Sequence, residues 1–113
     1  MPNPTSGRPF ISLDIALPQC CPISHNPQPG SCLVIQYRAK HHYLELYSLN
    51  AYLRRFIGGF KDAQGAIIIR DMETMIQCIA QDCADMVAVP VRVEARLKLV
   101  PIDMTLLVRG YPK

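Results

Sequence analysis

A strict alternation of apolar and polar residues near the end of the chain constrains the fold more than any other feature. From Val89 to Leu99 every odd-numbered position is apolar. The positions between them carry Pro90, Arg92, Glu94, Arg96 and Lys98. Successive side chains of a strand point to opposite faces of a sheet, so the pattern predicts a strand with one buried and one charged face. The charged face is expected to meet either solvent or the interior of an assembly.

Shorter patterns predict three more strands. Leu33–Arg38 alternates in the same way, and Tyr43–Leu46 is expected to return beside it, with the hairpin turn at Lys40–His42. After the long alternating strand, Pro101–Asp103 forms a turn that leads into a fourth strand, Met104–Arg109. The four strands therefore form two predicted pairs.

Two helices are predicted between these pairs. Ser48 is a good N-cap for the first helix, and Gly58–Gly59 is expected to end it, because glycine tolerates the left-handed conformation. A loop is expected from Phe60 to Ile69, and Asp71 is expected to cap the second helix. The apolar stripe of the second helix consists of Met72, Met75, Ile76, Ile79, Ala80 and Cys83. The element order is ββααββ.

This order predicts one α+β domain over residues 1–113, an antiparallel four-stranded sheet with both helices on one face. Residues 1–30 differ from the rest, because they hold seven of the ten prolines and only two charged residues, Arg8 and Asp14. Proline lacks a backbone N–H, so we expect an ordered arm with at most one short edge strand. Open sheet edges favour pairing with further copies, and a ring of subunits would close them.

Composition excludes several classes of protein. Half of the residues are hydrophobic, yet no apolar stretch approaches the roughly 18 residues of a membrane span. The N-terminus lacks the order of a signal peptide. Five cysteines without framework spacing indicate reduced thiols in a cytoplasm, and no metal site is expected, since the chain has no C-x-x-C and His41 and His42 are adjacent.

One segment of the arm carries candidate chemistry. Cys21 stands in a proline-bounded, largely uncharged stretch that suits a nucleophile held in place, and His25 follows closely enough to accept its proton. The alternative is that Cys20 and Cys21 are small buried apolar residues, as free cysteines often are.

The wider sequence resembles an enzyme family. Cys21-Pro-Ile-Ser-His-Asn-Pro-Gln-Pro-Gly is similar to the C-P-x-[ST]-x-x-P-[DK] element of 7-cyano-7-deazaguanine nitrile reductases, the QueF family, and Leu44-Glu-Leu-Tyr-Ser-Leu-Asn-Ala-Tyr-Leu53 is similar to their V-E-S-K-S-L-K-L-Y-L motif. The spacing also matches, and the resemblance covers roughly Cys21 to Leu99. It implies the tunnel fold (T-fold), in which ββααββ subunits join into a ring barrel.

The resemblance also implies how the chemistry departs from reduction. In the family the cysteine, here Cys21, attacks the nitrile carbon and forms a covalent thioimide. The catalytic aspartate falls on Gln28, and the two cofactor-binding lysines fall on Tyr47 and Asn50, so hydride transfer is expected to be disabled. Ammonia can instead attack the thioimide and expel the thiolate, giving an amidine without a redox cofactor.

That is the reaction of the QueF-like archaeosine synthases, amidinotransferases that convert 7-cyano-7-deazaguanine in tRNA to archaeosine. The chain resembles them in C-P-[IV]-S-x-N-P-x-P-G-S, in L-E-x-Y-S-L and in R-D-M-E-x-M-x-Q-x-I-A-x-D-C. A nitrile reductase with an altered cofactor site and a catalytically silent tunnel-fold RNA-binding protein are the alternatives.

Roles for individual residues follow from this resemblance. Cys21 is the expected nucleophile and His25 its proton acceptor or a surface histidine. Asn26 and Gln28 are expected to hydrogen-bond the polarised nitrogen or to position ammonia. Glu45, with the backbone of Leu44 and Leu46, is expected to bind the N–H edge of the base. Asp71 or Glu73 is a candidate for a second base-binding carboxylate, although Asp71 is the better N-cap.

Binding of tRNA requires basic side chains and extrusion of the target base. The RNA-binding candidates are Lys40, His41, His42, Arg54, Arg55, Lys61 and Arg70. Ammonia is the expected co-substrate and no cofactor is expected. Two stacked pentameric rings, a decamer, would carry about +30 from +3 on each chain.

Overall fold

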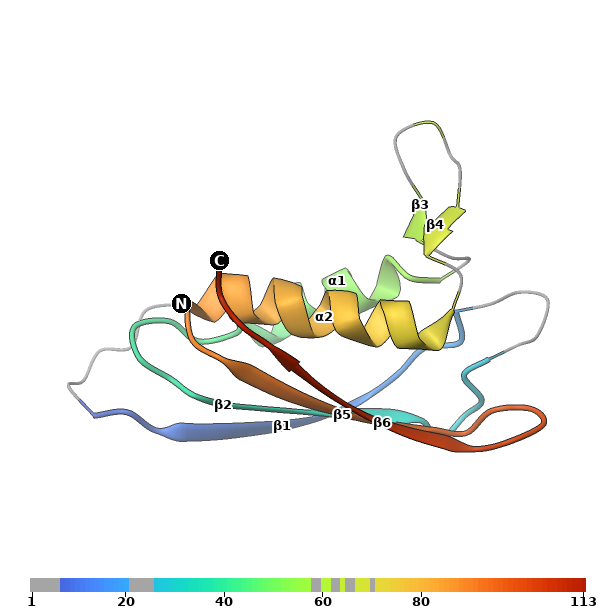
Figure 1. Ribbon diagram of the computed structural model, residues 1–113, viewed down its shortest axis with the longest axis horizontal. Helices are drawn as coiled ribbons and strands as arrows, with labels where there is room; N and C mark the ends of the chain where they lie inside the picture. Colours follow the sequence, from blue (N-terminus) through green and yellow to red (C-terminus); the bar gives the residue numbers. More distant parts are fainter. Residues whose placement is uncertain (1–6, 21–25, 58–59, 62–63, 65–66, 70) are drawn as a thin grey trace.

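Two helices cover one face of a four-stranded antiparallel sheet, and a small hairpin stands at one end of them (Figure 1). The computed structural model describes residues 7–20, 26–57, 60–61, 64, 67–69 and 71–113. The elements are β1 (Phe10–Ala16), β2 (Cys32–Arg38), α1 (Leu46–Arg54), β3 (Phe60–Lys61), β4 (Ile67–Ile69), α2 (Met72–Val87), β5 (Val91–Leu97) and β6 (Met104–Gly110). The predicted α+β class, with four antiparallel strands and two helices, is confirmed.

The sheet has the strand order β1-β2-β5-β6, so its two central strands are distant in sequence. β2 and β5 pair antiparallel, with Ile35 opposite Val93. Both residues are fully buried under the helices, whereas Arg92 and Glu94 alternate with Val93 on the opposite face. The alternation that predicted the strand around Val93 is therefore confirmed, and we call the face opposite the helices the open face.

The predicted partner of β2 is wrong. Tyr43–Leu46 is not a strand, because the chain leaves the sheet after Arg38 and enters α1 at Leu46. The edge position beside β2 is taken by β1, with Phe10 opposite Arg38 and Ala16 opposite Cys32. The edge strand expected in the arm is confirmed, but at seven residues it is as long as β2 rather than short. No proline interrupts Phe10–Ala16, so every backbone amide there can bond.

Two details of the helical region also differ from expectation. The stretch from Phe60 to Ile69, expected as a loop, contains the antiparallel pair β3 and β4. The N-cap of α1 is Glu45 rather than Ser48, which lies one turn inside. Gly58–Gly59, the expected end of the first helix, lies outside the described residues, and α1 itself ends at Arg54.

The core fills the space between the sheet and α2. Ile76, Ile79 and Ala80 on α2 have no exposed surface, which confirms the stripe predicted for the second helix. Cys83, on the same stripe, is 1% exposed and has the packing role expected for it. α1 adds Leu49 and Leu53 to this core. Among the described residues, no helix is both long and apolar enough to cross a lipid bilayer.

Candidate functional site

The segment that holds the expected nucleophile is fixed at both ends. Cys21 and His25 lie outside the described residues. On either side of them, the amide of Cys20 donates to the carbonyl of Asn26 over 3.0 Å. Cys20 is buried, and its Sγ lies 3.3 Å from the carbonyl oxygen of Pro18. The two ends of the segment 21–25 are therefore held side by side on the body of the domain.

Asn26 ties this segment to the turn between β5 and β6. Its Nδ2 donates to the carbonyl of Val100 over 3.3 Å, and its Oδ1 accepts from the amide of Val100 over 3.1 Å. Gln28 donates from Nε2 to the same Oδ1 over 3.4 Å, and its backbone amide donates to the carbonyl of Lys98 over 2.7 Å. Asn26 and Gln28, expected to contact substrate, thus lie together and also anchor the segment.

Ser31 is an anchor that the sequence patterns did not reveal. Its side chain is buried, donates to the carbonyl of Gln28 over 2.8 Å and accepts from the amide of Lys98 over 2.8 Å. These two bonds use the hydroxyl's donor and one of its two acceptor positions within the protein. Ser31 therefore joins the segment to the end of β5. The sequence signals were its position directly before a strand and its place at the end of the C-P-[IV]-S-x-N-P-x-P-G-S element.

The carboxylate of Glu45 begins α1. Oε1 accepts from the amide of Tyr47 over 3.0 Å, and Oε2 accepts from the amide of Ser48 over 2.8 Å and from its hydroxyl over 2.7 Å. These bonds, led by the Ser48 hydroxyl, lower the pKa of Glu45 below its ordinary value and keep it ionised at neutral pH. A carboxylate has about four acceptor positions, so Glu45 keeps capacity for one further N–H donor.

Leu44 and Leu46, on either side of Glu45, differ in how far they are exposed. Leu44 is buried, and its amide, expected to contact the base, donates to the hydroxyl of Tyr37 over 2.9 Å. Leu46 is 60% exposed. The cavity beneath Glu45 has a volume of about 20 Å³, which is too small for a base. A ring bound by Glu45 would therefore not fit inside this cavity.

A partly buried polar contact that the sequence did not suggest lies between α1 and α2. The hydroxyl of Tyr52 donates to Oδ2 of Asp82 over 2.6 Å, and Sγ of Cys78 lies 3.5 Å from the same oxygen. Burial, followed by the bond to Asp82, raises the pKa of Tyr52 far above its ordinary value. This contact joins the last turn of α1 to α2.

Asp71 and Glu73, the two carboxylates at the start of α2, have different surroundings. Asp71 caps α2, because its Oδ1 accepts from the amide of Thr74 over 2.7 Å and its Oδ2 from the Thr74 hydroxyl over 3.0 Å. The capping role favoured for Asp71 is confirmed, and these bonds lower its pKa. Glu73 is exposed in the first turn, where a negative charge complements the helix dipole.

The expected site residues fall into two groups at opposite ends of the sheet. The amide of Leu17 donates to the carbonyl of Ser31, so the connection that contains Cys21 leaves the sheet at the end where Ala16 pairs with Cys32. The connection to Glu45 leaves from Arg38, at the other end of β2 (Figure 1). A seven-residue strand is about 20 Å long. α2, which Asp71 caps, begins at the end of the sheet where β1 ends and β2 begins (Figure 1).

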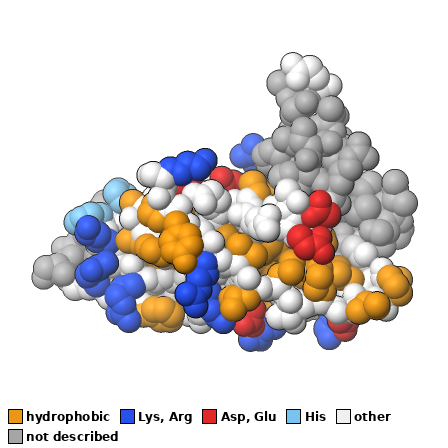
Figure 2. Space-filling view, in the orientation of Figure 1, with side chains coloured by type: hydrophobic (Ala, Val, Ile, Leu, Met, Phe, Trp, Pro, Cys, Tyr) orange, Lys and Arg blue, Asp and Glu red, His pale blue; other side chains and the backbone are white. Residues whose placement is uncertain are grey.

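Among the expected RNA-binding residues that the structure describes, Lys40 lies apart from Arg54 and Arg55. Lys40 is exposed just after β2, whereas Arg54 and Arg55 are exposed at the opposite end of α1, a nine-residue helix about 13 Å long. Arg70 and the side chain of Lys61 lie outside what the structure describes. Lys and Arg side chains gather toward the left of Figure 2, with histidines beside them, at the end where β1 begins and β2 ends. Lys40, His41 and His42 follow β2 at this end.

Neither a protein-family model nor a curated protein matches the chain. Within the described part of the chain, no group of three or more His, Cys, Asp and Glu side chains is placed to hold a metal ion.

Proposed function

We propose that the protein is an amidinotransferase that converts 7-cyano-7-deazaguanine in tRNA to archaeosine. The Cys21 thiolate adds to the nitrile carbon, the nitrile nitrogen takes up a proton, and a thioimide forms. Ammonia then adds to the same carbon, and the carbon–sulfur bond breaks to release the thiolate. The net reaction adds one ammonia to one nitrile and gives an amidine, with no electrons gained or lost.

The fixed frame around the Cys21 segment is the observation that carries this proposal. The Cys20–Asn26 bond and the Asn26–Val100 pair hold both ends of the segment. A nucleophile must be held within a fraction of an ångström of its reacting position, and a rigid frame supplies that restraint at no cost during the reaction. The motif resemblance identifies the residue that this frame serves.

The surface of α1 favours ammonia over hydride as the second reactant. Tyr47 is 88% exposed and Asn50 is exposed, and these are the positions where the resembling reductases carry lysines. Phosphates of a nicotinamide dinucleotide need cationic partners, and neither side chain offers one.

The separation of the two site groups favours a site shared between copies. Glu45 and the Cys21 segment leave opposite ends of one sheet, so a base could touch both only where the ends of two chains meet. β1 and β6 are sheet edges, and edge strands can pair with those of neighbouring copies. We therefore infer a tunnel-fold ring in which Cys21 of one copy and Glu45 of the next bind one base, with two pentameric rings forming a decamer.

The reaction is tested by its second substrate. The full chain is incubated with tRNA that contains the nitrile base, with ammonium chloride or with NADPH, and the nucleosides are analysed by mass spectrometry. The amidine should form with ammonium alone, and NADPH should not be consumed. Formation of an aminomethyl product with loss of NADPH would identify a reductase instead. Binding of tRNA without any product would identify a silent RNA-binding protein.

The shared site is tested by mixing two inactive variants. Cys21→Ala and Glu45→Ala chains are each expected to lack activity. Co-refolded at equal amounts, they should regain about a quarter of the wild-type activity, because about one interface in four joins an intact Cys21 to an intact Glu45. A Cys21→Ala chain mixed with a Cys21→Ser chain is the control and should regain none. If the first mixture also stays inactive, both residues act within one chain.

A further inference from the structure

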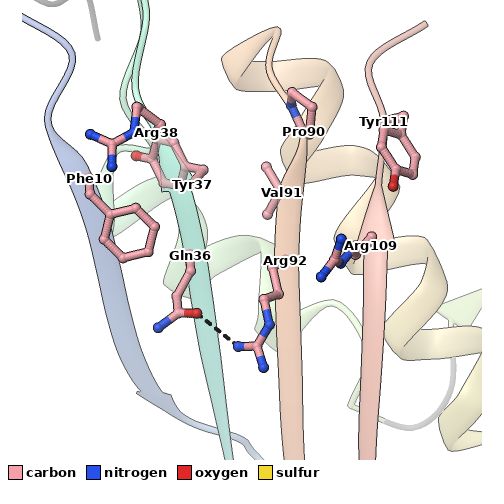
Figure 3. A pocket seen from close by; sticks show the side chains of 9 residues that line it. All are labelled: Phe10, Gln36, Tyr37, Arg38, Pro90, Val91, Arg92, Arg109 and Tyr111. Atoms are coloured by element: carbon pink, nitrogen blue, oxygen red, sulfur yellow. Dashed lines mark hydrogen bonds between the residues drawn. The ribbon is translucent and has the colours of Figure 1, made fainter.

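A shallow pocket of about 260 Å³ lies on the open face of the sheet (Figure 3). It occupies the end of the sheet where β1 begins, and all four strands of the sheet or their ends contribute to it. The side chains that matter for its chemistry are Phe10, Gln36, Arg38, Arg92, Arg109 and Tyr111. Neither the motif resemblance nor the proposed reaction uses any of them.

The pocket concentrates positive charge. Arg92 on β5 stands directly opposite Arg109 on β6, and Arg38 lies on the neighbouring strand β2. Like charges directly opposite each other destabilise a sheet, so an anion between Arg92 and Arg109 would relieve a repulsion present in the free protein. The nearest carboxylate, Glu94, lies 3.5 Å from Arg92 but also pairs with Arg96 over 2.6 Å. It belongs to the next row of the sheet and does not line the pocket.

Two of the three guanidinium groups are held in place by the protein. Nη1 of Arg92 donates to Oε1 of Gln36 over 2.8 Å, the bond drawn in Figure 3. Nη1 of Arg38 donates to the carbonyl of Arg8 over 2.9 Å, and its guanidinium carbon lies 5.5 Å from the ring centre of Phe10. A guanidinium has five N–H donors, so both keep donors for a ligand.

The side chain of Arg109, unlike those of Arg38 and Arg92, is not held by the described part of the protein. Among the described residues no hydrogen bond or ion pair engages its side chain, which is exposed. Figure 3 shows it reaching toward the space beside Arg92. Arg92 and Arg109 together can present the paired N–H groups that match phosphate oxygens.

An aromatic ring stands beside this pair of arginines. Tyr111 follows β6 directly, two residues after Arg109, and is 58% exposed. Phe10 lies across the sheet, but the guanidinium of Arg38 already covers its ring. Exposed aromatic rings next to basic groups on an open four-stranded sheet are the usual platform for stacked bases. Tyr111 is therefore the ring available to a base.

We propose that this pocket binds a nucleoside phosphate, with the phosphate on Arg92 and Arg109 and the base stacked on Tyr111. The volume is slightly below the range of about 300–1,000 Å³ common for ligand pockets, which suits one nucleotide rather than two. The site is separate from the proposed active site and does not depend on it.

Titration of the full chain with AMP, adenosine and inorganic phosphate tests the assignment. AMP should bind more tightly than phosphate, and adenosine should bind weakest. Arg109→Gln should weaken AMP binding by about tenfold or more, because it removes a charge-assisted contact without breaking a bond within the described protein. Tyr111→Ala should lower the affinity for AMP to that for phosphate. Lys98→Gln, on the same face but just beyond the far end of β5, is the control and should leave AMP binding unchanged.

A short single-stranded oligoadenylate distinguishes the two possible sources of the nucleotide, an RNA strand and a free nucleotide. If the oligoadenylate binds, if AMP displaces it and if Arg109→Gln weakens its binding, the pocket takes a nucleotide of an RNA strand. If AMP binds and the oligonucleotide does not, the ligand is a free nucleotide. The proposal is overturned if neither binds, if phosphate binds as tightly as AMP, or if Arg109→Gln and Lys98→Gln have equal effects. None of these outcomes bears on amidine formation, so the two proposals fail separately.

Discussion

The Cys21→Ala variant is expected to form no covalent adduct with 7-cyano-7-deazaguanine and to make no amidine. The thiolate supplies the bond that activates the nitrile carbon, and nothing else in the proposed reaction replaces it. We expect the rate of amidine formation to fall by at least about a thousandfold, since loss of a nucleophile typically removes most of the catalytic effect. Intact-mass spectrometry after mixing with the free base measures the adduct, and nucleoside analysis of tRNA measures the product.

Another cysteine of the chain provides the matched control for this experiment. Cys32 is half-buried on the open face of β2, so Cys32→Ala removes a thiol of similar size and should keep both adduct and product. Circular dichroism of both variants establishes that they fold. An adduct that persists in Cys21→Ala and disappears in Cys32→Ala would move the nucleophile to the open face and overturn the proposed reaction.

The Gly110→Ala variant is expected to lose a large part of its stability. Gly110 ends β6 and is buried where α2 crosses the sheet, and a Cβ added there would collide with the carbonyl oxygen of Ala80. Ala80 has no exposed surface and its carbonyl belongs to the helix backbone, so relief requires α2 to lift from the core. We expect the free energy of unfolding to fall by about 3 kcal/mol, the upper part of the usual range for overpacking.

Urea unfolding followed by circular dichroism measures this loss. Gly7→Ala is the matched control, since Gly7 is exposed ahead of β1, and the change there should stay within about 0.5 kcal/mol. A loss below about 1 kcal/mol for Gly110→Ala would mean that α2 and β6 do not approach at backbone distance.

Local patterns identified the elements whose faces are strongly two-sided. The alternation around Val93 and the stripe from Met75 to Cys83 each have one exposed and one buried face. Such a pattern fits only one repeat, two residues for the strand and 3.6 residues for the helix. The short apolar run Tyr43–Leu46 had no such constraint. Four residues suit a strand or a helix start equally well, and the carboxylate of Glu45 decides the outcome by capping α1.

Several site residues make structural hydrogen bonds that could not be predicted from their residue types. Asn26 and Gln28 were expected to meet substrate, yet their bonds to Val100 and Lys98 span some seventy residues of sequence. A sequence pattern shows only which residues are close along the chain. It therefore cannot predict a hydrogen bond to the distant turn between β5 and β6. The same holds for Ser31 and for the Tyr52–Asp82 contact.

The sequence by itself determined that the chain builds a half-covered antiparallel sheet with two amphipathic helices, because the periods of 2 and 3.6 residues follow from backbone geometry alone. It also placed a cysteine in a proline-rich segment ahead of the first central strand. Only the tertiary structure decided that β1 is the partner of β2, and that the Cys21 segment and Glu45 leave opposite ends of the sheet. Only the strand register brought Arg92 and Arg109 face to face beside Tyr111. Pairing between distant strands is set by the packing of the whole core, and no local pattern encodes it.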